Sequence, residues 1–373
     1  MGRTLYLHIG HFKTGTTALQ VFLARNPDFL ARHGLDYAEP FRKNAKHSAL
    51  AFSIYHAAGV ETLMHGYADP TPPEDLWALL FDYVRECPQP GVIVSSEEFM
   101  RLGGIEAALP RLPRLARLGR DIEIRVITYL RAPDAHLRSW YNQLVKMRQK
   151  VPDFETALRG MIEPVHLDYA LALRPWVETF GSENVILRPY EESFRGGTGL
   201  YADFLSIFGI DMPEKGLSLP EGDPNPRLDE RTLELVRMMQ NADFPRHLVR
   251  HVRARAEDHF AAEDALAGEA GAELDELYEL IRAGLAGLEG LPHNSINTAA
   301  FGRHLPTPEP SAGGGHERLT SFLFGEINTL RMRLNKSQRE LSARLEALEK
   351  GARREATDAE AKKAPRGTKR DAS

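Results

Sequence analysis

A glycine- and threonine-rich turn near the N-terminus has the residue types of a phosphate-binding loop. It runs from Gly10 to Thr17 and follows the apolar segment 5–9, which predicts a short strand before the turn. The helix expected over 18–32 would offer unpaired backbone N–H groups and a positive dipole end to an anion. Gly10 and Gly15 would let the backbone approach that anion closely, because neither carries a Cβ.

The side chains of this turn indicate which anion it binds. Lys13 would supply a mobile positive charge, and the hydroxyls of Thr14, Thr16 and Thr17 would add hydrogen-bond donors. A Walker A loop reads G-x-x-x-x-G-K-[ST], but here Thr16 stands at the lysine position and Lys13 lies three residues earlier. ATP chemistry needs a lysine beside the β- and γ-phosphates together with a metal. The pattern therefore disfavours ATP hydrolysis and favours a less charged anion, such as a phosphosulfate.

A second pattern of this kind lies near the middle of the chain. The segment 122–130 predicts a strand that leads into Arg131, and Pro133 suits the start of the helix that would follow. Ser139 comes eight residues after Arg131. Taken alone, Arg131 could be a surface residue at the end of a strand. Together with the first motif, the arginine and the serine predict a second anion site at the same edge of a sheet.

The two motifs resemble those of PAPS-dependent sulfotransferases, especially bacterial ones similar to carbohydrate sulfotransferases. PAPS is 3′-phosphoadenosine 5′-phosphosulfate. Segment 8–20 (HIGHFKTGTTALQ) is similar to the family's 5′-phosphosulfate loop, and Arg131 with Ser139 is similar to its 3′-phosphate pair. The resemblance covers roughly residues 1–210. It implies a hydroxyl acceptor, expected to be a saccharide, and donor-binding roles for Lys13, Thr14, Gly15, Thr16, Thr17, Arg131 and Ser139.

Two side chains are candidates for the base that takes the acceptor proton. Glu97 follows the apolar segment 92–94 and resembles the glutamate of a Ser-Ser-Glu segment in such enzymes. His47 is the other candidate, because similar sulfotransferases use a histidine from a comparable segment and an imidazole titrates near neutrality. The alternatives are that Glu97 only charges the first turn of a helix and that His47 is a surface or capping residue. Lys13 is expected to act in catalysis as well, by following the bridging oxygen as the sulfur–oxygen bond breaks.

The order of elements predicts an α/β fold with a P-loop-type, mostly parallel sheet flanked by helices and a helical C-terminal extension. We expect the sulfotransferase-like domain to span 1–300, with a core over 1–210 and a helical region over 211–300. The basic cluster of Arg246, His247, Arg250, His251, Arg253 and Arg255 is expected to be a solvated helix face, with a grip on an acidic glycan or on PAPS as the alternatives.

The C-terminal residues 301–373 show sequence patterns that differ from those of the expected α/β domain. Pro- and Gly-rich residues 301–316 predict a linker, and charged residues 351–373 predict a disordered tail. Between them, 317–350 predicts an amphipathic, coiled-coil-like helix, because apolar residues recur mostly every three or four positions at 323, 327, 330, 334, 341, 345 and 348. This helix could pair two subunits into a homo-oligomer or fold back on the body.

Composition excludes several other classes. The chain has 373 residues, 42% of them hydrophobic, and a net charge of −5, which does not point to a nucleic-acid partner. A single cysteine, Cys87, excludes an internal disulfide framework. Neither a signal peptide nor a transmembrane span of roughly 20 apolar residues is apparent, so we expect a cytoplasmic protein. The 14 histidines are scattered without HExxH or CxxC spacing, so no metal site is expected.

These observations favour a sulfotransferase that moves the sulfuryl group from PAPS to a hydroxyl by in-line displacement without a metal. Two alternatives stay open. One is a P-loop kinase that transfers phosphate from ATP to a small molecule. The other is a catalytically silent, nucleotide-binding scaffold that oligomerises through its C-terminal helix.

Overall fold

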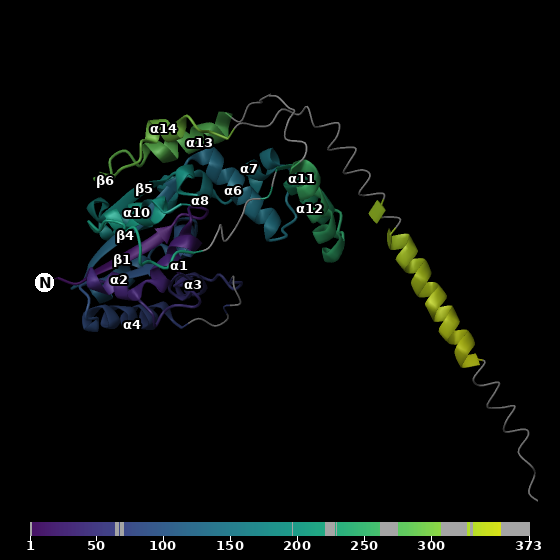
Figure 1. Cartoon of the computed structure of the whole chain (residues 1–373), viewed down its shortest axis with the longest axis horizontal. Coiled ribbons are helices and arrows are strands. Elements are labelled where there is room, and N and C mark those ends of the chain that lie inside the picture. Colours follow the sequence, from purple (N-terminus) through teal and green to yellow (C-terminus); the bar gives the residue numbers. More distant parts are fainter. Residues whose placement is uncertain are drawn as a thin grey trace, which may run out of the picture. The chain divides into compact units, whose positions relative to one another are not determined.

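The structure is a computed structural model that describes residues 2–63, 67, 71–195, 197–220, 228, 230–261, 275–306, 327–328 and 331–351 (Figure 1). Six parallel strands form one sheet in the order β2-β3-β1-β4-β5-β6. The predicted α/β fold with a mostly parallel, helix-flanked sheet is thereby confirmed. The strands are β1 Thr4–Gly10, β2 Leu35–Tyr37, β3 Gly91–Ser95, β4 Glu123–Arg131, β5 Val185–Tyr190 and β6 His293–Asn294.

Helices connect the strands and cover the sheet, as parallel pairing requires. Proline occupies the start of α2, α4, α6 and α8, where a missing N–H costs nothing. The α-helices are α1 Thr16–Arg25, α2 Pro27–Arg32, α3 Ser48–Ala57, α4 Pro73–Glu86, α5 Arg111–Ala116, α6 Pro133–Lys146, α7 Phe154–Gly160, α8 Pro164–Leu167, α9 Tyr169–Phe180, α10 Gly199–Ser206, α11 Glu230–Asn241, α12 Arg246–Ala261, α13 Asp275–Ala286 and α14 Thr298–Gly302. Two 3₁₀-helices, η2 Glu97–Gly104 and η6 Glu192–Phe194, adjoin the site described below.

The single helix predicted over 18–32 is wrong, because the structure divides it into α1 and α2 at Asn26. Pro27 has no N–H to continue the first helix, but it fits the first position of a new one. The side-chain amide of Asn26 donates to the carbonyl of Phe22 at 2.7 Å and so closes the end of α1. The short strand β2, which pairs with β3, was not foreseen.

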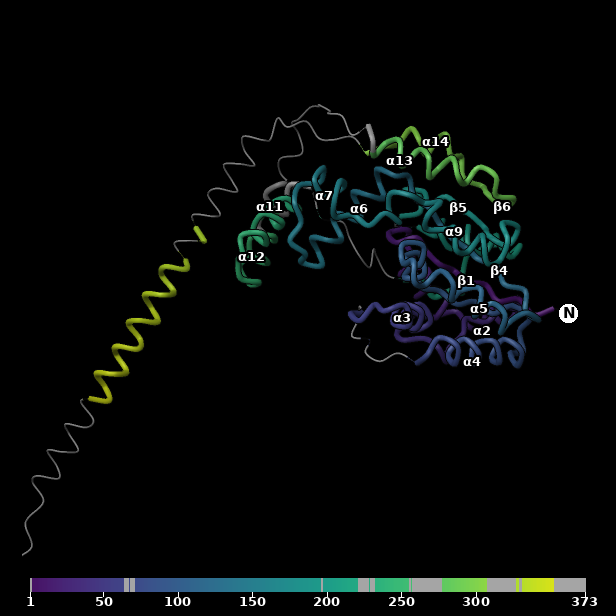
Figure 2. Tube along the Cα trace, turned by 180° about the vertical axis from the view of Figure 1, so that it is seen from behind, coloured from purple at the N-terminus to yellow at the C-terminus, as the bar shows by residue number. Residues whose placement is uncertain are grey.

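Helices α1, α2 and α10 pack against the sheet through one buried cluster. Their apolar side chains share this cluster with residues of β2, β3 and β4, including Phe22, Ile93, Ile127, Tyr129 and Phe204. Helix α9 contacts β4 and β5 with a separate set of buried residues that contains Trp176. Figure 2 shows the molecule from behind, with α9 beside β4 and β5. The central strands are thus buried, as expected for a parallel sheet with helices packed against it.

The topology brings the carboxyl ends of four strands together. Strand β1 lies between β3 and β4, and β4 pairs with β5, all parallel. The segments that follow Gly10, Ser95, Arg131 and Tyr190 therefore leave the sheet at the same edge. This is the edge at which open parallel sheets bind ligands.

The chain divides into two compact units, the first comprising Met1–Leu233 and Ala265–Pro310 and the second Glu234–Asp264 and Ser311–Ser373. The first contains the sheet. Within the second, residues 331–351 are helical, and the Arg331 guanidinium lies 5.8 Å from the centre of the Phe244 ring. Residues 307–316 of the expected linker, 317–326 and 329–330 of the expected helix, and 352–373 of the expected tail lie outside the described residues.

Candidate active site

The glycine-rich turn between β1 and α1 depends on backbone conformations that favour glycine. Gly10 has φ +92° and Gly15 has φ +74°, both in the left-handed region. A Cβ on Gly10 would lie 3.1 Å from the Cα of Glu97, and one on Gly15 would lie 2.6 Å from Leu200 Cδ2. The two glycines therefore let the start of η2 and the start of α10 approach the turn closely.

Two of the threonines hold the turn in shape. The hydroxyls of Thr14 and Thr16 donate to the carbonyl of His11 at 2.6 Å and 3.2 Å. The hydroxyl of Thr128, on neighbouring β4, donates to the carbonyl of Gly10. Thr14 is buried and is not among the residues that line the adjoining cavity, whereas Thr16 and Thr17 are. Thr14 thus supports the backbone of the turn in the structure.

A cavity of about 460 Å³ lies at this edge of the sheet. Its lining includes both sequence motifs, with Lys13 from the turn and Arg131 from the end of β4. It also includes four basic side chains and two carboxylates, namely Lys13, Lys46, Arg131, Arg195, Glu97 and Glu98. Aromatic surface is supplied by Phe12, Trp140, Tyr190, Phe194 and Tyr201. The size, apolar walls and excess of positive charge suit an anionic ligand with an aromatic ring.

Arg131 lines this cavity with its side chain largely buried. Its Nε donates to Glu192 Oε1 at 2.7 Å, and its guanidinium lies 5.7 Å from the centre of the Tyr190 ring. Glu192 is 54% exposed, against 3% for Arg131, so the carboxylate can leave while the arginine stays. Ser139 lines the same cavity from α6, two turns after the helix begins.

Glu97 is held from two sides at the start of η2. The Lys46 ammonium donates to Oε1, and the Gln20 amide donates to Oε2 at 3.0 Å. Burial lowers the pKa of Lys46, but the charges of Glu97 and Glu98, the hydrogen bond to Glu97 and the nearby Tyr67 together raise it, so the pKa lies above the ordinary value. Glu98 accepts hydrogen bonds from Ser48 and Ser96, at 3.0 Å and 2.5 Å. The carboxylate of Glu97 therefore has a defined position beside a permanent cation.

His47 has a different environment. It is fully buried and does not line the cavity. Its Nε2 lies 2.7 Å from the carbonyl of Ala38, and the backbone N–H of Ser95 donates to its Nδ1 at 3.0 Å. Burial lowers its pKa to about 4, so the ring is neutral near pH 7. Both ring nitrogens are thus engaged with the backbone, where they join α3 to the end of β3.

Several cavity residues were not identified from the sequence. Gln143 accepts a hydrogen bond from the Lys13 ammonium at 3.2 Å. It lies four residues after Ser139 on α6, so helical spacing from Ser139 could have suggested it. Lys46 adjoins His47 in sequence, but only the fold shows that the lysine, and not the histidine, reaches the cavity. Arg195 follows β5 and η6, with no motif that marks it.

Comparisons with known proteins add little to this geometry. No protein-family model matches the sequence. A protein of Archaeoglobus fulgidus, described only as uncharacterized, is 31% identical over 126 residues, which is 33% of this chain and 31% of that protein. The chain therefore spans about a third of the length of this relative. None of the helices in the described part of the chain is long and apolar enough to cross a membrane.

The fold is similar to that of a solved structure. The structure of a sulfotransferase from Alicyclobacillus acidocaldarius matches with a TM-score of 0.45 and 20% sequence identity, covering 81% of this chain and 99% of that chain. A likeness of this degree carries no argument about activity.

Proposed function

We propose that this chain is a PAPS-dependent sulfotransferase that transfers a sulfuryl group to a hydroxyl acceptor. The observation that carries the proposal is that Lys13 and Arg131 line one cavity, although they come from motifs far apart in the sequence. A donor with a phosphosulfate at one end and a 3′-phosphate at the other needs two such cationic positions. ATP offers no group for the second position.

The donor would span the cavity between the two motifs. Its phosphosulfate would lie on the turn after β1, where Lys13, Gly15, Thr16, Thr17 and the first amides of α1 converge. Its 3′-phosphate would take the place of the Glu192 carboxylate on Arg131, with Ser139 as a further donor. The aromatic side chains of the lining would contact the adenine. Thr14 would act indirectly, by fixing the backbone of the turn through His11.

The reaction we propose is a displacement at sulfur. The acceptor oxygen forms a bond to sulfur while the bond from sulfur to the 5′-phosphate oxygen breaks, and that oxygen keeps the electron pair. Lys13 would neutralise the charge that grows on the leaving phosphate, which is adenosine 3′,5′-bisphosphate. The acceptor proton would go to a carboxylate in the cavity.

We assign the proton transfer to Glu97 and not to His47. Glu97 lines the cavity, and its two oxygens are oriented by Lys46 and Gln20. Its position opposite the turn follows from the glycine at position 10, which lets η2 begin against the loop. His47 could act only through Ser95 and the strand end, which would make it a positioning residue.

The acceptor and the quaternary structure are further parts of the proposal. A saccharide hydroxyl is supported by the resemblance of segment 8–20 to carbohydrate sulfotransferases. A homo-oligomer is supported by the helix 331–351, on which Leu334, Leu341 and Leu348 recur every seven residues and are each more than half exposed. Light scattering of the full chain beside a chain that ends at residue 326 tests this pairing, and equal oligomeric states would exclude it.

Calorimetry tests the donor site directly. The wild-type chain should bind adenosine 3′,5′-bisphosphate more tightly than ADP, since only the former has a phosphate for Arg131. Radiolabelled PAPS with a panel of saccharide, phenol and steroid hydroxyls then tests turnover. Transfer from ATP with magnesium would favour a kinase, and binding without turnover on any acceptor would favour a silent scaffold. Equal affinity for the two nucleotides would overturn the proposal.

A further inference from the structure

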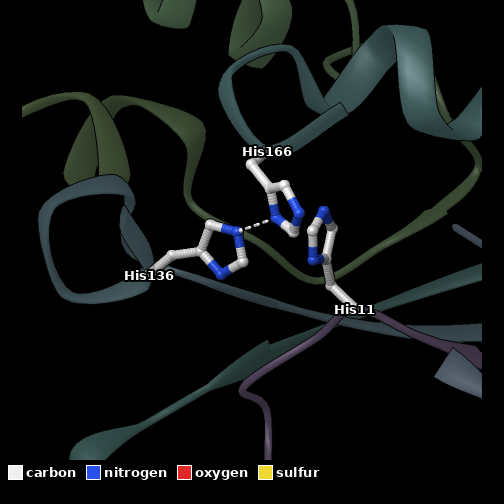
Figure 3. Close-up of side chains that lie close together, drawn as sticks. All are labelled: His11, His136 and His166. Carbon is white, nitrogen blue, oxygen red and sulfur yellow. Dashed lines mark hydrogen bonds between the residues drawn. The ribbon is translucent and has the colours of Figure 1, made fainter. Parts of the chain in front are cut away.

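Three histidines converge directly behind the turn that follows β1 (Figure 3). His11 belongs to the turn, His136 to the first turn of α6, and His166 to α8. All three side chains are buried, and one nitrogen of each ring lies within 4.8 Å of one nitrogen of each of the others. Because the three positions are far apart in the sequence, no spacing motif marks this cluster.

Three of the six ring nitrogens in the cluster have no hydrogen-bond partner among the described residues. His11 Nε2 lies 3.0 Å from the carbonyl of Val165, which only an N–H can satisfy, and His136 Nε2 lies 3.0 Å from His166 Nδ1. Among the described residues, His11 Nδ1, His136 Nδ1 and His166 Nε2 have no partner. In a neutral cluster, His11 Nδ1 and one of the other two nitrogens are therefore buried lone pairs without a donor. Buried polar atoms are normally paired, so this arrangement needs an explanation.

The surroundings of the cluster favour the form of histidine that binds metals. Burial lowers the pKa of His11 to about 4 and holds the pKa values of His136 and His166 well below the ordinary value. The rings are thus neutral at pH 7, as ligation requires. The bond from His11 to the Val165 carbonyl is the outer contact that metal-bound histidines usually make, because it orients the ring and leaves the other nitrogen for the metal.

The donor set also restricts the kind of ion. Three imidazoles without a carboxylate among them suit Zn²⁺, Co²⁺, Ni²⁺ or Cu²⁺, whereas Mg²⁺ and Ca²⁺ prefer oxygen ligands. Zn–N bonds of about 2.0–2.1 Å place tetrahedral ligands roughly 3.4 Å apart, so a pair of nitrogens as far apart as 4.8 Å would have to close by about 1.4 Å. Side-chain rotations of this size need no change of fold. The fourth position would be left to a small ligand such as water.

We propose that His11, His136 and His166 form a binding site for one zinc-class divalent cation. The ion would connect the turn after β1 to α6 and α8, and so join the element that carries Lys13 to the helix that carries Ser139. It would act as a structural clamp behind the cavity and take no part in the transfer itself. The proposal stands independently of the proposed sulfotransferase activity.

Metal binding by the full-length, untagged chain tests the proposal. Protein stripped with a chelator should bind one Zn²⁺ in competition with a chromophoric chelator, its melting temperature should rise, and excess Mg²⁺ should do neither. X-ray absorption of the zinc form should show three imidazole nitrogens. His136→Gln and His166→Asn, which keep one polar atom near the original nitrogen, should each weaken binding at least about tenfold, since even outer contacts are worth 10–100-fold.

A second pair of histidines must be separated from this site. His247 and His251 lie four residues apart on the exposed part of α12, a spacing that can chelate zinc weakly. The double variant His247→Gln/His251→Gln serves as the control and should still bind one Zn²⁺. Loss of zinc in this control, or a shell with fewer than three imidazoles, would overturn the proposal. If His136→Gln or His166→Asn does not fold, as judged by circular dichroism, the absorption result on the wild type decides.

Discussion

The cavity lining has two parts that are built in different ways, which we call the loop end and the arginine end. The loop end is made by consecutive residues from Gly10 to Thr17, and its shape depends on left-handed glycines and on hydroxyls bonded to the local backbone. The arginine end combines Arg131 from the end of β4, Ser139 from α6 and Glu192 from η6. At the loop end the donors are preformed. At the arginine end the exposed carboxylate of Glu192 is paired with the Arg131 guanidinium, so a ligand phosphate has to displace that carboxylate.

This difference predicts that changes at the loop end affect turnover and stability, whereas changes at the arginine end affect nucleotide affinity and selectivity. The loop end contains the proposed leaving-group cation, Lys13, and adjoins the proposed base, Glu97. The arginine end would only hold the distant phosphate of the donor. The following experiments test this division, beginning with the largest expected effect.

Glu97→Gln should lower kcat about 10²–10⁴-fold, because the amide cannot accept the acceptor proton. The affinity for adenosine 3′,5′-bisphosphate should change little, since the oxygen of the new amide can still accept from the Gln20 amide or the Lys46 ammonium. Initial rates with PAPS and calorimetry with the bisphosphate measure the two quantities. His47→Asn is the matched control and should keep most of the activity. If His47→Asn lowers kcat strongly while Glu97→Gln keeps its activity, the base would be His47 and not Glu97.

Acid should destabilise the region around the loop end. Burial lowers the pKa of His8 to about 3 and that of His47 to about 4, and each contacts Ser95 at the end of β3. The unfolded chain takes up these protons near pH 6.5, but the native chain only near pH 4 or below. The stability that these two histidines contribute is therefore full above pH 6.5 and falls as the pH drops towards 4, with a combined slope of up to about 3 kcal/mol per pH unit. The pKa values of His11, His136 and His166 are lowered as well, so these residues add to the slope of the whole chain in the same direction.

Urea unfolding of chelator-treated protein at pH 7, 6 and 5 measures this slope. His8→Asn keeps a polar atom for the Ser95 hydroxyl but removes the titration, so its slope should be smaller by up to about 1.4 kcal/mol per pH unit. The free energy of unfolding of His8→Asn at pH 7 provides the reference. A wild-type stability that does not change between pH 7 and pH 5 would contradict the burial of neutral histidines in this region.

Arg131→Ala should weaken binding of adenosine 3′,5′-bisphosphate roughly 30–100-fold, as expected for about 2–3 kcal/mol from charged hydrogen bonds. Binding of ADP, which has no 3′-phosphate, should change less than about threefold. Arg131→Lys should lie between the two, because it keeps the charge but loses the planar fork. Calorimetry with both nucleotides gives the comparison. A parallel loss of affinity for the two nucleotides would place Arg131 away from the 3′-phosphate.

Glu192→Gln should have the smallest effect and the opposite sign. The pair that it forms with Arg131 is exposed on the carboxylate side, and such pairs are worth about 0.2–1 kcal/mol. Removing the competing charge should tighten bisphosphate binding by at most about fivefold. Glu191→Gln, also exposed and bonded to Ser193, is the control for a general change of charge. Weaker binding by Glu192→Gln would show that Glu192 assists the nucleotide.

The sequence alone determined those features that depend on neighbouring residues. Apolar segments located the strands β1 and β4, and apolar residues that recur every three or four positions located the helix over 331–351 within the expected range 317–350. Glycine and threonine spacing identified the turn after β1, and parallel topology implied that Lys13, Arg131 and Glu97 would meet at one edge, where the structure places them. Pro27 could have indicated the break between α1 and α2, but the helical pattern on both sides of it favoured one continuous helix.

Only the tertiary structure decided which groups touch each other. It paired Glu97 with Lys46, enclosed His47 between two backbone groups and put a carboxylate on Arg131. It also gathered His11, His136 and His166 from three separate elements. Such contacts depend on the register and packing of segments that are distant along the chain, and those are set by the fit of the whole buried core. Local patterns specify what an element is, whereas long-range packing specifies its neighbours.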